Sequence, residues 1–340
     1  MKKLLIILSI TFGWSKTIQA QVISISQPYT TAQLLSPATV GAGLYKQRIQ
    51  SDLRTQLIDG SNLYTTAVAG WDTKINSADR DEANYLGVGI QLVSDKLMNG
   101  LIQNNAISLN FAYHMYLGQM KYDNISMGLG GMFSQTSVDK SGLYFGDQYY
   151  SSGVSTGSGS MEQIRDFPYS VSMNSGLLYT RHDPSFYFKI GISGFYFEKP
   201  QVTNSAIFQS NGIRKLLFIN GEHKLFYNNT FLIHGSASEQ NGIRRYIGGV
   251  AISFPITSNW EEIKRMYVGC AYRRNESIIP TISFLMEKHS FGFSYDINSV
   301  NLTGAQLRQN NFEISYSRSC LLYTSPSPRD RQKPRMPCSA

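Results

Sequence analysis

The chain has 340 residues, a formal net charge of +8 and 3 cysteines. Residues 1–20 contribute +3 of that charge and residues 320–340 another +3, so the stretch between them carries only +2. A charge this small argues against a nucleic-acid-binding protein. Because Cys270 is the one cysteine in that stretch, no intramolecular disulfide is expected there, and the thiol is expected as a small packed residue.

Residues 1–20 are typical of a secretory signal peptide. Lys2 and Lys3 precede the apolar run from Leu4 to Phe12, and an acceptable cleavage site follows at Ala20. The apolar run is too short to span about 30 Å of hydrocarbon as a helix. We therefore expect an exported mature chain that starts at Gln21 and contains no transmembrane helix.

Residues 21–43 are irregular, and we expect them in the mouth or the lumen of a barrel formed by the later residues. From Tyr45 on, apolar residues alternate with small or polar ones in short stretches, and this period of two predicts β-strands. The predicted strands are Lys46–Gln56, Asn62–Lys74, Tyr85–Ser94, Gln103–Leu117, Tyr122–Gln135, Tyr169–Arg181, Phe186–Lys199, Lys215–Tyr227, Thr230–Glu239, Arg245–Pro255, Lys264–Asn275, Thr281–Met286, Phe291–Ile297 and Phe312–Tyr316. Their number, about 14, is even and within the range of bacterial outer-membrane barrels.

The composition of the two strand faces distinguishes a membrane barrel from a soluble β-sandwich. The outer face of a soluble sandwich is usually rich in Lys, Glu and Thr, whereas here Gly, Ser, Asn and Gln oppose a heavily aromatic face. We therefore predict an all-β fold, a transmembrane antiparallel β-barrel that occupies residues 21–319 as one domain. The predicted lipid-facing residues include Phe186, Phe188, Ile190, Phe291 and Phe293.

The longest gap between predicted strands runs from Thr136 to Phe167. Its middle, Tyr149 to Ser160, is rich in Gly and Ser, which predicts a mobile loop that projects from the barrel.

The histidines and the glycine-rich stretch of the sequence do not form a recognisable metal or phosphate site. None of the 5 histidines (His114, His182, His223, His234 and His289) has a metal-ligand spacing. His114 lies on a polar strand face, where a hydrogen-bonded lumenal residue is expected. Gly128 to Gly131 lies within an alternating strand, with no helix after it to hold a phosphate, so close packing is the expected role of these glycines.

The charged residues of the sequence do not form a recognisable catalytic site either. Asp79, Asp81 and Glu82 lack the EF-hand spacing and are expected in a solvated turn. The pairs Arg244–Arg245 and Arg273–Arg274 are expected to place a cation at a strand end or in the lumen. We expect no catalytic residues, no cofactor and no metal.

The stretch Cys320 to Ala340 departs from the rest of the chain. Alternation stops, and Pro, Arg and Ser take over. A basic disordered tail is one reading. Since the stretch can be back-translated into a sequence that resembles a transposase sequencing adapter, we interpret it as a non-native tail. The natural chain would then be cut in or just after its last strand, and barrel closure would be defective.

Several motifs resemble the PorP/SprF family of Bacteroidetes outer-membrane proteins. They are Ser26-Gln-Pro-Tyr29, Ser36-Pro-Ala-Thr-Val-Gly-Ala-Gly43, Gly269-Cys-Ala-Tyr-Arg-Arg-Asn-Glu-Ser-Ile-Ile-Pro280, Phe291-Gly-Phe-Ser-Tyr-Asp-Ile-Asn298 and Phe312-Glu-Ile-Ser-Tyr-Ser317. The N-terminal motifs depart from the family pattern, with Ser36 in place of asparagine and altered spacing. The C-terminal motifs match it more closely.

The resemblance implies a barrel of the cell outer membrane that is associated with type IX secretion. Implied partners are the periplasmic ring, translocon proteins and secreted cargo with a C-terminal sorting domain, including gliding adhesins. The barrel would dock or anchor that cargo. The residues leave two alternatives open: a passive porin or channel for small solutes, and an outer-membrane enzyme.

Overall fold

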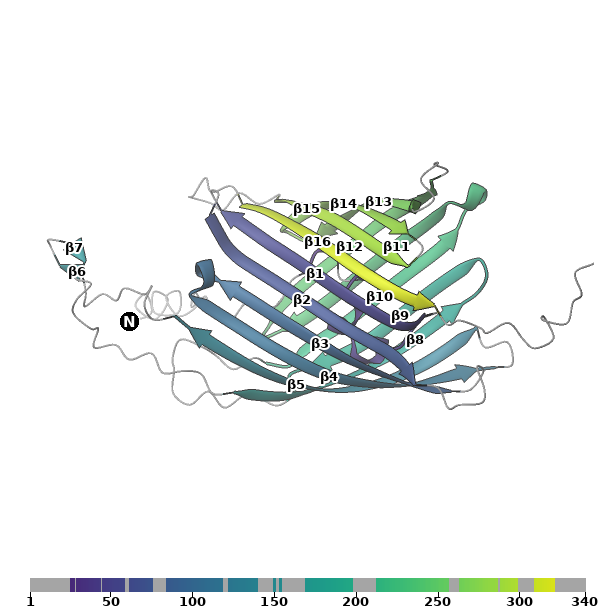
Figure 1. Ribbon diagram of the computed structural model, residues 1–340, viewed down its shortest axis with the longest axis horizontal. Coiled ribbons are helices and arrows are strands. Elements are labelled where there is room, and N and C mark those ends of the chain that lie inside the picture. Colours follow the sequence, from purple (N-terminus) through teal and green to yellow (C-terminus); the bar gives the residue numbers. More distant parts are fainter. Residues whose placement is uncertain are drawn as a thin grey trace, which may run out of the picture.

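The computed structural model describes residues 25–27, 29–43, 45–58, 61–75, 84–118, 122–139, 149–150, 153–154, 169–197, 212–256, 263–286, 288–298 and 309–321. In this part of the chain, 14 antiparallel strands form a closed barrel (Figure 1). Neighbours along the chain pair in order, β5 pairs directly with β8, and β1 pairs with β16 to close the ring. The predicted fold class is confirmed.

The strands of the barrel wall are β1 Tyr45–Ile58, β2 Ser61–Ile75, β3 Tyr85–Leu97, β4 Ile102–Leu117, β5 Asp123–Val138, β8 Ser170–His182, β9 Phe186–Phe195, β10 Arg214–Lys224, β11 Thr230–Gln240, β12 Ile243–Pro255, β13 Ile263–Arg273, β14 Ser277–Met286, β15 His289–Asn298 and β16 Gln309–Leu321. A separate hairpin consists of β6 Tyr149–Tyr150 and β7 Gly153–Val154. Short 3-10 helices are η1 Ala32–Leu34, η2 Pro37–Thr39, η3 Met98–Gly100 and η6 Phe226–Asn228. No helix among the described residues is long and apolar enough to cross a bilayer.

Local sequence explains where several strands end. Asn241 and Gly242 separate β11 from β12, and both have positive φ values, 50° and 80°. A two-residue hairpin turn of this kind needs that conformation, which Asn and Gly adopt with little strain. β5 continues to Val138, so the predicted gap from Thr136 to Phe167 starts too early. Most of that gap lies outside the described residues, and its predicted mobility stays a prediction.

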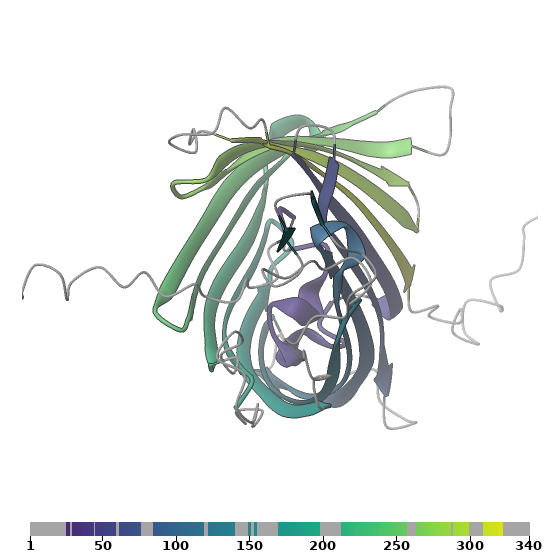
Figure 2. The same cartoon turned by 90° about the vertical axis from the view of Figure 1, so that its left-hand side faces the viewer.

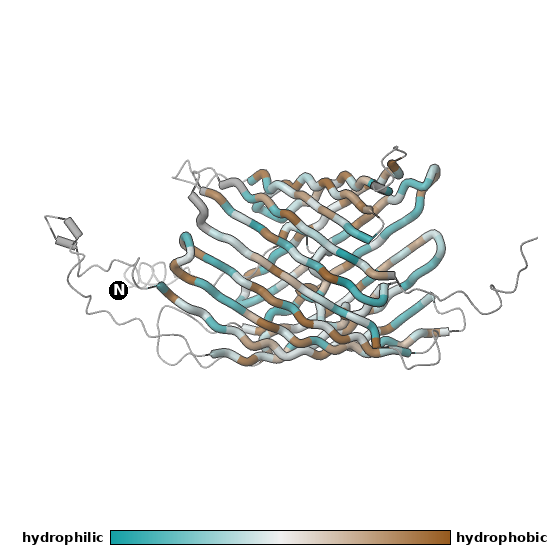
Figure 3. The backbone as a smooth tube through the Cα atoms, in the orientation of Figure 1, coloured by the Kyte–Doolittle hydropathy of each residue, from teal (hydrophilic) through white to brown (hydrophobic). Residues whose placement is uncertain are grey.

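Buried and exposed residues alternate along most strands, as expected for side chains that point in turn to the lumen and to the outer surface. Hydrophilic and hydrophobic residues likewise alternate along the strands (Figure 3). Ile190 is 38% exposed and Phe293 is 42% exposed on the outer surface. Phe186, Phe188 and Phe291 share these strand faces, so all five residues predicted to contact lipid face outward. Cys270 also lies on the outer face and is exposed, so the expectation of a packed thiol is wrong.

The two ends of the barrel carry connections of different length. At the end where β1 begins and β16 ends, which we call the terminal end, the longest connection joins Ile75 to Tyr85. At the opposite end, which we call the loop end, residues 139–169 join β5 to β8 and residues 196–213 join β9 to β10. Outer-membrane barrels have short periplasmic turns and longer extracellular loops. The barrel has the same asymmetry, with its shorter connections at the terminal end.

β16 corrects the sequence-based expectation of incomplete closure. It pairs with β1 from Gln309 opposite Ile58 to Leu321 opposite Tyr45, along the whole of β1. Cys320 and Leu321 thus extend the strand past the predicted boundary at Ser319. Strand pairing uses backbone groups, so a change in side-chain composition does not by itself end it. Residues 322–340 lie outside the described part of the chain.

Candidate functional site

The described residues between the signal-like start and β1 lie inside the barrel. We call residues 25–43, of which Pro28 is not described, the lumenal segment; it includes η1 and η2 (Figure 2). Ser26, Gln27, Ala38 and Val40 are each 0% exposed. The prediction that this region lies in the mouth or lumen of a barrel is confirmed.

The beginning of the segment is bound to the last two strands. The backbone N–H groups of Ser26 and Gln27 donate to the two carboxylate oxygens of Glu313 on β16, at 2.6 and 2.7 Å. The Ser26 hydroxyl donates to Oδ1 of Asp296 on β15, at 2.7 Å. Hydrogen bonds to a carboxylate are about twice as strong as neutral ones, so these contacts fix the backbone firmly.

Two arginines complete this arrangement. Asp296 Oδ2 lies 2.9 Å from Arg54 Nη2 on β1 and 2.8 Å from Arg273 Nη1 on β13, and Arg54 Nε lies 3.9 Å from Glu313. Arg273 Nη2 also donates to Ser26 Oγ, at 3.0 Å. The four charged side chains are at most 6% exposed. We call Arg54, Arg273, Asp296 and Glu313 the lumenal ionic network; two cations balance two anions where water is largely excluded.

The end of the segment is bound to the first strands. Asp72 on β2 accepts hydrogen bonds from the Gly41 N–H at 2.8 Å, from the Tyr45 hydroxyl at 2.8 Å and from Arg48 Nε at 2.9 Å. His114 on β4 lies 2.7 Å from the Val40 carbonyl oxygen through Nε2. Because a carbonyl only accepts, Nε2 carries the hydrogen. His114 is therefore the hydrogen-bonded lumenal residue that was predicted.

The middle of the segment contacts β4 on one side and β8 to β10 on the other. Asn110 on β4 donates to the Gln33 side chain at 3.0 Å, and Ser193 on β9 donates to the Leu35 carbonyl oxygen. An apolar cluster joins the segment to β8 and β10; its members are Leu35, Ala38, Ala42, Leu178, Leu216 and Phe218. A Cβ atom at Gly128 would overlap the Ala38 backbone, so the close-packing role predicted for this glycine is confirmed. The segment thus spans the lumen from wall to wall.

A lumenal cavity of about 520 Å³ lies at the terminal end of the barrel, beside the lumenal segment. Side chains from β1, β9 and β10 line it, among them Tyr45, Arg48, Tyr187, Lys189, Glu222 and Lys224. Asp183, in the turn after β8, lies at its rim, and hydrogen bonds from the Ser185 N–H and hydroxyl lower the pKa of its carboxyl below the usual value. We call this cavity the vestibule.

The structure brings together motif residues that are far apart in the sequence. Ser26, Gln27, Arg273, Asp296 and Glu313 all meet in or at the lumenal ionic network, whereas Arg244 and Arg274 lie on the outer surface at the loop end. The predicted acidic turn at residues 79–82 lies outside the described residues. Among the described residues there is no group of three or more His, Cys, Asp or Glu side chains that could hold a metal ion.

Sequence reasoning missed three charged residues on the first two strands. Arg54, Asp52 and Asp72 are at most 5% exposed and face the lumen. Asp52 accepts a hydrogen bond from the Thr30 hydroxyl at 2.8 Å, which adds a further contact to the lumenal segment. Their spacing could have identified two of them as lumenal residues. Asp52 and Arg54 alternate with apolar Leu53 and therefore share the lumenal face of β1.

Comparison with known proteins agrees with this architecture. No curated protein matches the chain. The toluene transporter TbuX of Ralstonia pickettii is similar, with a TM-score of 0.50 and 9% identity over 86% of this chain and 94% of that one. A deletion mutant of TodX, a monoaromatic hydrocarbon channel, has a TM-score of 0.50 and 10% identity over 85% and 94%; TodX is from Pseudomonas putida. At such identities the likeness shows the fold alone.

A family model described as type IX secretion system membrane protein PorP/SprF matches residues 17–317. That range contains the whole lumenal segment and every strand of the barrel except the last residues of β16. The chain therefore belongs to the PorP/SprF family of type IX secretion system membrane proteins.

Proposed function

We propose that the protein is an outer-membrane component of type IX secretion that docks or anchors secreted or surface-exposed cargo of the gliding-adhesin type. In this role it catalyses no reaction. Its partners would be the periplasmic ring, translocon proteins and cargo that carries a C-terminal sorting domain. Family membership supports the association with type IX secretion.

The observation that carries the docking role is the lumenal segment. Its polar groups are bound to β1, β2, β4, β15 and β16, and its apolar side chains pack against β8 and β10. A segment held on so many sides favours a rigid body that presents surfaces rather than an open pore. Rigid, preorganised surfaces lose little conformational entropy when a partner binds.

The two ends of the barrel suit different partners. The vestibule at the terminal end combines tyrosine rings with Lys189, Lys224 and Glu222, so it offers both apolar and charged contacts to a periplasmic protein. The Lys189 ammonium lies 5.1 Å from the centre of the Tyr187 ring, which holds both side chains against one wall. The longer connections at the loop end would face the cell exterior and any surface-exposed cargo.

The alternative is a passive channel for small solutes. It draws support from the likeness to TbuX, named as a toluene transporter, and to TodX, named as a monoaromatic hydrocarbon channel. The likeness is one of fold, and the lumenal segment opposes a permanently open path. A channel would therefore need the segment to move.

One pair of measurements separates these functions. The full chain, purified in detergent, would be mixed with a C-terminal sorting-domain fragment of a protein secreted by a type IX system, and it would also be inserted into planar bilayers. Docking predicts that the fragment co-purifies while conductance stays at the level of protein-free bilayers. Steady conductance without fragment binding would favour the channel and reject docking. An unrelated secreted domain serves as the control for non-specific binding.

A further inference from the structure

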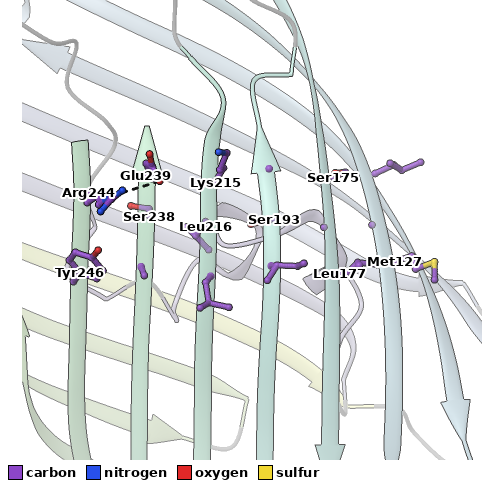
Figure 4. Close-up of a pocket in the computed structure, with 17 residues that line it drawn as sticks. Met127, Ser175, Leu177, Ser193, Lys215, Leu216, Ser238, Glu239, Arg244 and Tyr246 are labelled. Atoms are coloured by element: carbon purple, nitrogen blue, oxygen red, sulfur yellow. Dashed lines mark ion pairs between the residues drawn. The ribbon is translucent and has the colours of Figure 1, made fainter. Parts of the chain in front are cut away.

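A groove lies on the outer surface of the barrel, away from the lumenal segment. It has a volume of about 860 Å³ and crosses β5, β8, β9, β10, β11 and β12 (Figure 4). Strand register arranges its side chains in two rows that run across the strands. The row nearer the loop end contains Lys215, Glu239 and Arg244, which are paired in that order on β10, β11 and β12.

The second row lies two residues closer to the middle of the barrel and is apolar. Leu217 pairs with Ile192, and Ile192 pairs with Leu177, so their side chains form a continuous strip on the outer surface. Tyr246 continues the strip on β12. Leu217, Ile192 and Leu177 are 48%, 53% and 46% exposed. The strip therefore faces whatever surrounds the barrel, and in a membrane this is hydrocarbon.

Cations gather at the loop end of this strip. Arg274 follows directly after β13, and its guanidinium carbon lies 5.3 Å from the centre of the Tyr246 ring. Arg244, Tyr246 and Arg274 line an adjoining cavity of about 450 Å³. Lys215, Arg244 and Arg274 thus surround one region of the outer surface, and the guanidinium groups can each bind an anion through two parallel N–H groups.

The acidic residues nearby do not neutralise this region. Glu239 lies 3.9 Å from Arg244 Nε, and both side chains are solvent-exposed, at 44% and 66%, so the pair is long and weak. Glu276 lies 3.6 Å from Nε of the lumenal Arg273. Glu276 also lines the adjoining cavity, so three outward cations face two acids, Glu239 and Glu276, and the region keeps a net charge of +1.

We propose that this groove binds an anionic phospholipid, in which no cationic headgroup cancels the charge of the phosphate. An acyl chain lies along Leu217, Ile192 and Leu177, and the phosphate binds Arg244 and Arg274, with Lys215 beside it. A lipid fits because the groove has one apolar part and one cationic part on a surface that faces hydrocarbon. A free phosphate would leave the apolar strip unused, and a lipid without net charge would leave the positive charge of the region unbalanced.

The test is native mass spectrometry of the full chain in detergent, with heat-modifiable migration on gels to confirm that each variant is folded. The probes are phosphatidic acid and, with the same acyl chains, phosphatidylcholine. The test variant is R244Q/R274Q. The matched control is K264Q/R318Q, which removes two outward cations at the terminal end. Inorganic phosphate serves as competitor, and A237F fills the apolar strip between Leu217 and Tyr246.

We expect the wild-type protein to retain phosphatidic acid about tenfold better than phosphatidylcholine, and R244Q/R274Q to lose about that factor. K264Q/R318Q should retain the lipid as the wild type does, A237F should weaken retention, and inorganic phosphate should not displace it. Equal loss in R244Q/R274Q and K264Q/R318Q would overturn the proposal, since general charge would then explain retention. Equal retention of both lipids, unchanged retention by A237F, or full displacement by inorganic phosphate would overturn it as well.

Discussion

Ser26 and Asp296 are 270 positions apart in the chain, and the Ser26 hydroxyl donates a 2.7 Å hydrogen bond to the Asp296 carboxylate. The same carboxylate binds Arg54 and Arg273. Asp296 is therefore the point at which the start of the lumenal segment, the first strand and the C-terminal strands are held together.

Replacing Asp296 with Asn should destabilise the protein by about 3–5 kcal/mol, because Arg54 and Arg273 would stay buried without the one carboxylate that both of them contact. Urea unfolding in lipid vesicles measures this change. The control is Asp123→Asn, which breaks the exposed pair with Arg181 and should cost at most about 1 kcal/mol. Similar losses for the two variants would show that the network adds nothing beyond a surface ion pair.

Replacing Gly128 with Val should displace the lumenal segment, since the new side chain would overlap the backbone of Ala38. We expect protease cleavage within residues 25–43 and a stability loss of about 1–3 kcal/mol. Gly131→Val is the control on the same strand, because a Cβ there meets nothing within 4 Å. If the two variants resist protease equally, the segment does not depend on this contact.

Replacing Ile190 with Arg should destabilise the barrel by about 2–4 kcal/mol if the residue lies near the bilayer midplane, where an exposed cation has no water. Ile190 faces outward from the central part of β9 and is 38% exposed. Unfolding in vesicles would be compared with that of Ile190→Leu, which keeps the surface apolar. A negligible effect of the arginine would contradict the lipid-facing assignment.

Deleting residues 322–340 should leave folding unchanged, because β1 is paired along its length by Gln309–Leu321. Deleting residues 309–340 should abolish folding, since unpaired backbone groups in hydrocarbon cost several kcal/mol each. Heat-modifiable migration on gels distinguishes the two outcomes. Loss of folding in the shorter deletion would show that residues 322–340 are part of the native protein rather than an adapter-derived tail.

Much of the barrel could be predicted because its signal is local. The alternation of apolar and polar residues along a strand such as Phe291 to Ile297 indicates which residues share a face, and it does so whichever strands pair with it. The outward direction of Ile190 and Phe293 and the hydrogen-bonded role of His114 follow from that pattern together with the shortage of lysine and glutamate on the polar face. The family motifs added Ser26, Gln27, Asp296 and Glu313 as residues of interest, without saying what they contact.

The candidate site depends on contacts that no local pattern contains. Arg54, Arg273, Asp296 and Glu313 come from four strands, and they meet only because the barrel closes, with Arg54 directly opposite Glu313 and Asp296 two residues away in the register. Each of them alone is indistinguishable from a solvated lumenal charge. The arrangement is selected because buried charges are tolerated only when paired, and the lumenal segment supplies the remaining hydrogen-bond partners. Whether a buried charge has such partners depends on residues that are distant in the sequence, so the local sequence pattern could not reveal it.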